Sequence, residues 1–295
     1  MIHRVTENIK FSMLTTNMLN IQREYSDLME KLATQKMINR PSDDPVGTNK
    51  ILDSRTALNA INQYDSNITD AQIALSITSS ALSSVKKIIA EAVTIAISEA
   101  GTGSPETMAI SAQTVISLID ESMTLMNTKN GDSYIFAGSR TDTIPYVFDT
   151  FSDAYMYQGN DDPLKVLVGN GNTFVHNITG ADAFGGTDVL DTLTSLRVAL
   201  EANDTDAINA QIDLLRNLES RVLQAETSAG AKMSSLELTR SNHDKLKLEL
   251  TNMLADVENA KMESLITAFL MKQIAMQASY SMAAKIGEMT IMSYL

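Results

Sequence analysis

The residues of this chain best suited to chemistry are two short groups of carboxylates and amides. Asp43 and Asp44 stand side by side in the segment NRPSDDPVG, between two prolines. Asn160, Asp161 and Asp162 form a second group directly before another proline. Oxygen ligands of this kind bind Ca²⁺, but a calcium site needs about six to eight of them at fixed spacing. Each group supplies too few, so we interpret the first as a helix cap and the second as a turn.

The histidines do not form a recognisable metal or catalytic motif. His3, His176 and His243 fall in different predicted elements, and none belongs to a HExxH pattern. His243 lies on an apolar helical stripe, where a packed imidazole is the ordinary interpretation and a pH-sensitive contact the sharper alternative. GNGN at 169–172 lacks the strand-to-helix context of a nucleotide-binding loop and predicts a hairpin turn. We therefore predict no metal, no cofactor and no enzymatic activity; an enzyme that uses residues 140–200 as a pocket is the most distant alternative.

The composition is that of a folded, mainly helical protein. The chain has 295 residues, of which 44% are hydrophobic and 20% charged, with 17 methionines, no tryptophan and only 5% aromatic residues. Flexible aliphatic side chains in these proportions favour packed helices. The net charge of −13 disfavours nucleic acid and anionic membranes as partners, because both attract basic proteins. The absence of cysteine excludes a disulfide, a thiolate zinc site and a thiol nucleophile.

No segment has the composition of a cleaved secretory signal or of a membrane span. Residues 1–20 lack an uninterrupted apolar core, and no stretch approaches the roughly 18 apolar residues that a transmembrane helix needs. We therefore expect a protein that stays inside the cell or leaves it by a route that needs no cleaved signal.

Apolar residues at alternating steps of three and four predict long helices with one apolar stripe each. Such spacing runs through 61–96, and after the cap Asp204 through 215–229 and 236–257, two stripes slightly out of phase around Gly230, where a local adjustment or short interruption is expected. A proline and an Asn-Gly pair delimit a further helix between 104 and 131. The segment 133–190 is instead rich in Tyr, Phe and Val and predicts short strands. The same three-four spacing predicts an N-terminal helix whose packing stripe includes Leu14, Met18, Ile21, Tyr25, Leu28 and Leu32.

The C-terminal segment is apolar on most sides of its predicted helix. Between 262 and 295 the only charged residues are Glu263, Lys272, Lys285 and Glu288. A single partner helix covers one face, so the remaining apolar surface must be enclosed by other copies of the chain. We therefore expect the two chain ends to pair, to pack into a multi-subunit core, and to be poorly ordered in the free monomer. The packing residues predicted on this helix are Ile266, Phe269, Leu270, Ile274, Met282 and Ile286.

The proline-containing segment after the N-terminal helix predicts a restricted linker followed by a new helix. Pro41 restricts the linker, and Asp43 or Asp44 is the expected cap. Pro45 takes the first helical position, where a missing amide costs nothing because it would have no acceptor within the helix. Carboxylates are also favourable beside the positive end of a helix.

The stretch INRPSDDPVGTNKILDSR at 38–55 resembles the hallmark of the flagellin superfamily, in the form found where the flagellar hook joins the filament. GDSYIFAGSRTDTIPY, LESRVLQAETSAGAKMSSLELTRSNHDKL and ESLITAFLMKQIAMQASYSMAAKIGEMTIMSYL are similar to further segments of the same branch. The resemblance covers about 1–146 and 205–295. The family usually has glycine where Gln35 and Lys36 stand, which argues against a sharp turn at position 35.

The resemblance implies a structural subunit of the bacterial flagellum, at the junction between hook and filament. The paired chain ends would form the inner layer of a tubular assembly, and the protein would reach the cell exterior through the flagellar type III export channel. Implied partners are further copies of the chain in a ring, a neighbouring hook-associated protein, flagellin and an export chaperone. The alternatives are flagellin itself and a soluble coiled-coil adaptor or chaperone.

We therefore expect a mainly α fold, an elongated rod of long antiparallel coiled-coil-like helices from both chain ends, with a small β-rich insertion. The expected parts are an N-terminal assembly helix, the first half of a helical rod domain, a β-rich surface insertion, the second half of the rod domain and a C-terminal assembly helix, at 1–40, 41–140, 141–195, 196–261 and 262–295.

Overall fold

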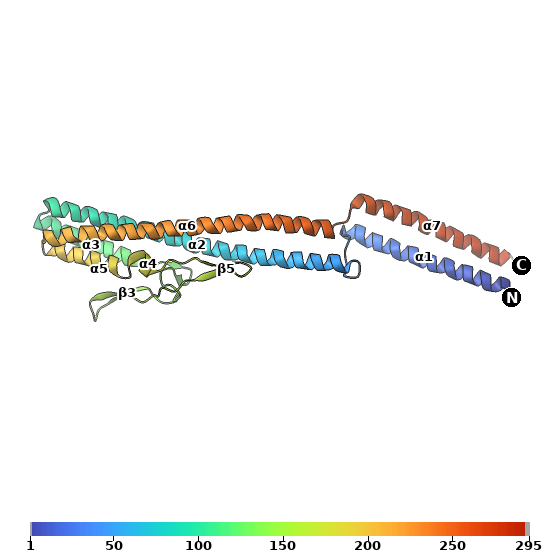
Figure 1. The fold of residues 1–295 in the computed structure, drawn as a ribbon, viewed down its shortest axis with the longest axis horizontal. Helices are drawn as coiled ribbons and strands as arrows, with labels where there is room; N and C mark the ends of the chain where they lie inside the picture. Colours follow the sequence, from blue (N-terminus) through green and yellow to red (C-terminus); the bar gives the residue numbers. More distant parts are fainter. Residues whose placement is uncertain (1, 293–295) are drawn as a thin grey trace. The chain divides into compact units, whose positions relative to one another are not determined.

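The computed structural model describes residues 2–292, which fold into long helices and a small strand-containing middle region (Figure 1). The helices are α1 (Ile2–Thr34), α2 (Pro45–Thr102), α3 (Pro105–Met126), α4 (Gly180–Phe184), α5 (Asp188–Glu201), α6 (Thr205–Glu258) and α7 (Met262–Met292). The strands are β1 (Lys129–Asn130), β2 (Ser133–Tyr134), β3 (Tyr146–Asp149), β4 (Ala154–Tyr157), β5 (Lys165–Gly169) and β6 (Asn172–Val175). The predicted mainly α fold with a small strand-rich region is confirmed. The chain divides into two units, one of residues 1–60 with 246–295 and the other of residues 61–245.

The first unit contains both chain ends. Figure 1 shows α1 and α7 side by side, and Tyr25 stacks on Phe269 with ring centroids 4.8 Å apart. Glu24 forms an ion pair with Lys272. Tyr25 follows Glu24 along α1, whereas its partner Phe269 precedes Lys272 along α7. The two helices therefore run antiparallel.

The second unit has a core in which α2 and α6 are paired by heptad repeats. The fully buried residues of α2 include Ile68, Leu75, Leu82 and Ile89. The fully buried residues of α6 include Leu215, Val222, Ala229 and Leu236. Spacing by seven keeps one face of each helix toward its partner. The pair is antiparallel, because Asp65 contacts His243 at 2.8 Å and Lys86 forms an ion pair with Glu226.

Helix α3 begins with the cap that the sequence predicts. Ser104 and Thr107 form a capping box, in which each side chain accepts a hydrogen bond from the other residue's backbone amide. Pro105 occupies the first turn, where its lack of an amide hydrogen costs nothing. The turn between α2 and α3 is therefore satisfied by local hydrogen bonds.

The strand-rich segment forms separate antiparallel hairpins, β1–β2, β3–β4 and β5–β6, in the described part of the chain. Aromatic rings anchor this segment to the second unit. Tyr146 is fully buried beside Phe184, and Phe136 packs edge-on against the same ring at 4.9 Å. The Tyr157 hydroxyl donates to the carbonyl of Phe136 at 2.8 Å. Buried aromatic pairs of this kind stabilise a region whose strands are too short to be stable alone.

Helix α5 is an element that the sequence analysis did not separate from the strand-rich segment. Its core-facing residues have clear helical spacing, but the run is short and directly follows a glycine-containing aromatic stretch. Tertiary packing against α3 supplies the stability that such a short helix lacks by itself. The buried apolar residues of α5 are Val189, Leu190, Leu193, Leu196, Ala199 and Leu200.

Candidate assembly surface

The apolar stripe predicted on α1 is the face that this helix turns toward α7. The members named above are half-buried, whereas Phe11, which continues the same three-four spacing toward the N-terminus, is exposed, as is Met13 on another face. The stripe consists of Leu14, Met18, Ile21, Tyr25, Leu28 and Leu32. Three-four spacing is thus satisfied by one partner helix, as in a two-stranded coiled coil.

The face of α7 that meets α1 lies beside the predicted one. Leu265 is the most buried residue of this face, with 6% of its surface exposed. The other members are half-buried and keep the three-four spacing. The residues of α7 that combine this burial with the three-four spacing, here called the α7 seam, are Met262, Leu265, Phe269, Lys272, Met276, Ser279 and Ala283.

The other packing residues predicted on α7 face away from α1. Phe269 belongs to both sets, and the side chain of Ile286 lies outside the described residues. The remaining predicted residues are exposed in the single chain, and Ile274 keeps 66% of its surface in contact with solvent. This exposed α7 face consists of Ile266, Leu270, Ile274 and Met282. Its residues follow one another at steps of four and eight, and each step of four turns about 40° around the helix, so they spread over the exposed side of the described part of α7 with Ile274 in the middle.

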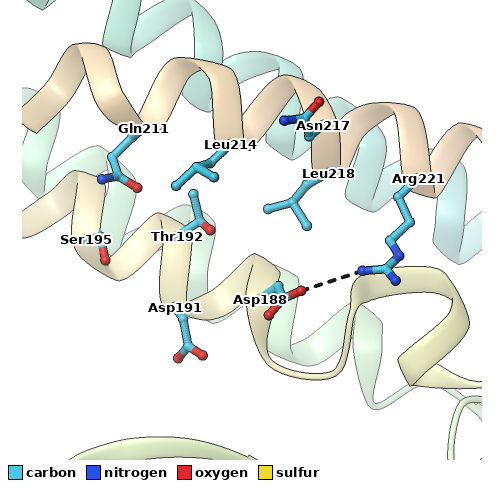
Figure 2. A pocket seen from close by; sticks show the side chains of 9 residues that line it. All are labelled: Asp188, Asp191, Thr192, Ser195, Gln211, Leu214, Asn217, Leu218 and Arg221. Carbon is cyan, nitrogen blue, oxygen red and sulfur yellow. Dashed lines mark ion pairs between the residues drawn. The ribbon is translucent and has the colours of Figure 1, made fainter.

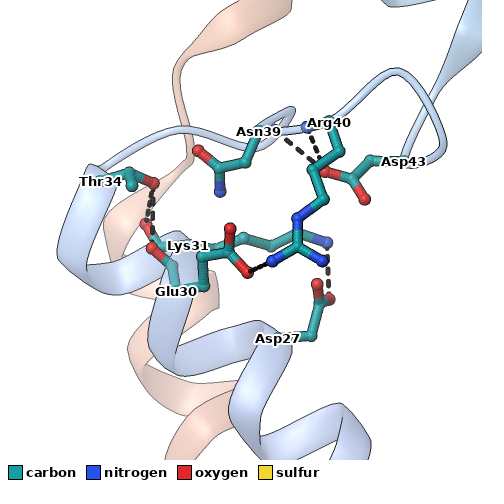
Figure 3. A network of polar contacts seen from close by, with 7 residues as sticks. All are labelled: Asp27, Glu30, Lys31, Thr34, Asn39, Arg40 and Asp43. Carbon is teal, nitrogen blue, oxygen red and sulfur yellow. Dashed lines mark hydrogen bonds and ion pairs between the residues drawn. The ribbon is translucent and has the colours of Figure 1, made fainter.

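The linker after α1 is held by a network of polar contacts (Figure 3). Asp43 accepts hydrogen bonds from the backbone amides of Asn39 and Arg40 at 3.0 and 2.9 Å. These two backbone hydrogen bonds hold the pKa of Asp43 below its ordinary value. Arg40 also reaches back to Glu30 at 2.8 Å. The linker therefore closes on the last turns of α1, and Pro41 lies exposed within it.

Asp44 stands directly before α2 and fulfils the capping geometry. Its side chain accepts a hydrogen bond from the amide of Val46 at 3.0 Å, and its carbonyl accepts one from Thr48 at 2.8 Å. Pro45 is the first residue of the helix. The two aspartates thus have different roles, because Asp43 closes the linker and Asp44 caps α2.

The chain does turn sharply at position 35, contrary to the expectation from the missing glycine. Helix α1 ends at Thr34, and Gln35 adopts a left-handed conformation with φ of 58°. A side chain in this region costs roughly 1–2 kcal/mol relative to glycine. Backbone hydrogen bonds offset the cost, because the Gln35 carbonyl accepts from the amide of Ala260 at 3.0 Å and Met37 donates to Glu258 at 2.7 Å.

Glu258 connects the two linkers of the first unit, a role that the sequence analysis missed. Its carboxylate is nearly buried and forms ion pairs with Lys36 and with Arg55, the latter at 2.9 Å. Burial alone would raise the pKa of Glu258, but the hydrogen bonds and positive charges of Lys36 and Arg55 outweigh it and hold the pKa below its ordinary value. In the sequence, the only sign of this role is that Glu258 is an acidic residue just after the predicted helical spacing ends at 257.

An open cleft lies between α5 and α6 in the second unit (Figure 2). It measures about 600 Å³, and Asp188 and Arg221 form an ion pair of 3.5 Å at one end. Leu214 and Leu218 line its α6 side, while Ser195 is one of its hydroxyls. No imidazole is present among the nine lining residues, and the carboxylates that line the cleft are those of Asp188 and Asp191.

The described histidines are engaged in packing. His243 contacts Asp65 at 2.8 Å within the α2–α6 seam, beside the ring of Tyr64. Burial and the charge of Lys232 lower the pKa of His176, so the neutral imidazole is favoured. Within residues 2–292, no group of three or more His, Cys, Asp or Glu side chains is arranged to hold a metal ion. No helix in the same range has the length and apolar character of a membrane span.

Comparison with known proteins agrees with this architecture. Residues 5–141 match the bacterial flagellin N-terminal helical region. Flagellar hook-associated protein 3 of Salmonella typhimurium is 28% identical over 94% of this chain and 95% of its own length. The protein of the same name from Escherichia coli is 26% identical over 88% of this chain and 90% of its own. A solved structure of a putative flagellar hook-associated protein from Vibrio parahaemolyticus is 27% identical, with a TM-score of 0.68 over 74% of this chain and 100% of that one.

These matches identify the class of protein first: the chain is similar to the flagellin superfamily, because residues 5–141 match its N-terminal helical region. Within that superfamily it is similar to flagellar hook-associated protein 3 over almost its whole length.

Proposed function

We propose that this chain is a structural subunit of the bacterial flagellum, located at the junction between hook and filament. Its relatives named flagellar hook-associated protein 3 match both the chain ends and the middle, since the matches cover most of each sequence. The family is one of structural flagellar proteins, which points away from catalysis. The observation that carries the proposal is the exposed α7 face, which remains uncovered after α1 has paired with α7.

Other copies of the same chain are the occupants that we propose for the exposed α7 face. A protein that leaves such a face in water loses the free energy of burial, about 1.5–3 kcal/mol for each large aliphatic side chain that is fully buried. Identical neighbours related by a rotation can cover one another's exposed faces and close into a ring. We accordingly assign the segments 1–40 and 262–295 to assembly and the segments between them to the helical rod domain and its surface insertion.

The remaining partners follow from the position at the junction. A neighbouring hook-associated protein would contact the ring on one side and flagellin on the other. An export chaperone would cover the exposed α7 face inside the cell, since free apolar faces of this kind promote aggregation. Export would occur through the flagellar type III channel without signal cleavage, and the lack of disulfides is compatible with passage as an unfolded chain.

Truncation tests the assembly role of the chain ends. Removing about 30 residues from either end should leave the second unit folded, because its buried core lies within residues 61–245. Cells that carry either truncation should shed their filaments. Filaments that stay attached to such cells would show that the ends are not needed for assembly.

Deletion of the gene separates a junction subunit from flagellin. Loss of a junction subunit should leave hooks on the cell and release flagellin into the medium. Loss of flagellin would remove the filament material altogether. An absence of flagellin from both cells and medium would therefore contradict the proposed location.

Hydrogen exchange separates an assembly subunit from a soluble adaptor. We expect the amides of 1–35 and 262–295 to exchange rapidly in the dilute free protein and slowly in isolated flagella, since assembly supplies their missing contacts. The second unit should be protected in both samples. Slow exchange of both ends in the dilute free protein would favour the adaptor.

A further inference from the structure

Among the side chains that the structure describes, one ion pair joins α1 to α7, on a helix with few charges. Between residues 264 and 284, Lys272 is the only charged residue of α7. Its side chain is 39% exposed and forms an ion pair with Glu24 on α1. The neighbouring seam position holds the stack of Tyr25 on Phe269. The polar and the aromatic contact are therefore adjacent in an otherwise aliphatic seam.

Aliphatic contacts alone do not determine how far the two helices slide past each other. Both seams repeat every seven residues, so a shift by one heptad again places apolar residues opposite apolar residues. Met18, for example, is one heptad from Tyr25, and Met276 is one heptad from Phe269. In the observed register Met18 and Met276 are opposite each other. The helices are antiparallel, so moving seven residues back from Tyr25 on α1 corresponds to moving seven residues forward from Phe269 on α7. Flexible methionines adapt to many partners and specify the register poorly.

The polar contact distinguishes the observed register from both shifted ones. A shift of one heptad in one direction would place Lys272 opposite Lys31, a like charge. A shift in the other direction would place it opposite Asn17 and leave Glu24 without its partner. Either shift also separates the rings of Tyr25 and Phe269. Repulsion in a wrong pairing is the usual means by which coiled coils reject alternatives.

We propose that the Glu24–Lys272 ion pair and the Tyr25–Phe269 stack together determine the register of the α1–α7 pair. The register in turn decides where Ile274 and the rest of the exposed α7 face lie along the pair. The claim about register concerns the single chain; its consequence for ring formation rests on the proposed function. The two claims can therefore fail separately.

Engineered disulfides measure the register directly, because the natural chain has no cysteine. Met18→Cys with Met276→Cys reports the observed register. Phe11→Cys with Met276→Cys reports the shift that places Lys272 opposite Asn17. Oxidation of the dilute, purified full-length protein traps each pairing even when the ends are helical for only part of the time. The ratio of the two disulfide yields is the measured quantity.

Charge reversal with rescue supplies the test. Glu24→Lys should lower the ratio of observed to shifted disulfide by about three-fold or more, since it replaces an exposed attraction with a repulsion. Adding Lys272→Glu to the same chain should restore the ratio. Lys285→Glu, at an exposed lysine of the same helix, is the control and should leave the ratio unchanged. Tyr25→Leu should lower the ratio, whereas Tyr25→Phe should preserve it because the ring is retained.

An unchanged ratio in Glu24→Lys, or a double variant as defective as Glu24→Lys alone, would overturn the inference about register. The same variants should be scored for attached filaments. The disulfide ratio of the purified variants could fall and recover as expected while cells carrying the same variants keep their filaments. That result would support the inference about register and contradict a role of the register in assembly.

Discussion

Replacing Ile274 with asparagine should abolish ring assembly while leaving the single chain folded. Ile274 lies at the centre of the exposed α7 face, and 66% of its surface is exposed after α1 has paired with α7. The side chain therefore contributes little to the fold of one chain. Its contribution is expected only when another copy covers the face.

The magnitude follows from the area that remains to be buried. Full burial of an isoleucine is worth about 1.5–3 kcal/mol, so the exposed two-thirds of Ile274 corresponds to about 1–2 kcal/mol for each subunit. That loss lowers each association constant by about five- to thirty-fold. Asparagine adds a cost of about 1–3 kcal/mol if its amide is buried without a partner. Because every copy in a ring carries the substitution, the losses repeat at each contact.

A matched control distinguishes a specific loss of assembly from a general effect of placing a polar side chain on the surface. Ile110 on α3 is 69% exposed and lies in the second unit, outside the proposed assembly face. Ile110→Asn makes the same chemical change at almost the same exposure. The thermal unfolding of both purified variants should match that of the parent within about 0.5 kcal/mol, as is usual for surface substitutions.

The assay counts attached filaments and the flagellin released into the medium. Cells with Ile274→Asn should release flagellin, and cells with Ile110→Asn should keep their filaments. Equal behaviour of the two variants would refute the reasoning, because the exposed α7 face would then have no special role. Unfolding of purified Ile274→Asn at a lower temperature than the parent would also contradict it, since the residue would then be part of the fold of the single chain.

Further predictions concern the linkers and the second unit. Glu258→Gln leaves Lys36 and Arg55 without their anion and should destabilise the joined linkers by about 1–2 kcal/mol, a modest cost because both cations are half exposed. Faster hydrogen exchange of the Met37 amide would show this loss. Unchanged exchange would argue against a stabilising role of the ion pairs. The pKa of His176 is lowered in the folded state, so its stabilisation is present above the ordinary histidine value of about 6.5 and is lost as pH falls toward the folded pKa. Chemical unfolding between pH 7.5 and 5.5 should show this decline, and His176→Gln should reduce it; an equal slope in the variant would contradict the assignment.

Helices α1 and α7 differ in how well the spacing of their apolar residues predicts which face is buried. The α1 stripe was predictable because one set of three-four positions, including Leu14, Met18 and Ile21, is apolar without interruption, whereas the other apolar residues of α1 are scattered. On α7 almost every position is apolar, so several stripes fit the same sequence equally well. The seam through Leu265 was selected by contact with α1, and the predicted stripe through Ile274 was left exposed.

Glu258 illustrates a contact that local pattern cannot predict. Its partner Arg55 is 203 residues away along the chain, and such a pair forms only when α2 and α6 have come together. The left-handed Gln35 is similar, because glycine is the residue expected at such a position. The backbone hydrogen bonds that hold this turn join Gln35 to Ala260, between α6 and α7, and Met37 to Glu258, the last residue of α6.

The sequence by itself determined the features that act over a few residues or one helical repeat. These are the start of α2 at Pro45, the cap of α3 at Ser104 and the heptad cores of α2 and α6, all of which depend on local backbone chemistry or on a single period. Tertiary structure decided which side of α7 meets α1 and how Glu258 joins the linkers. Both depend on surfaces brought together from opposite ends of the chain, and an apolar or charged residue carries no local information about which distant partner it will meet.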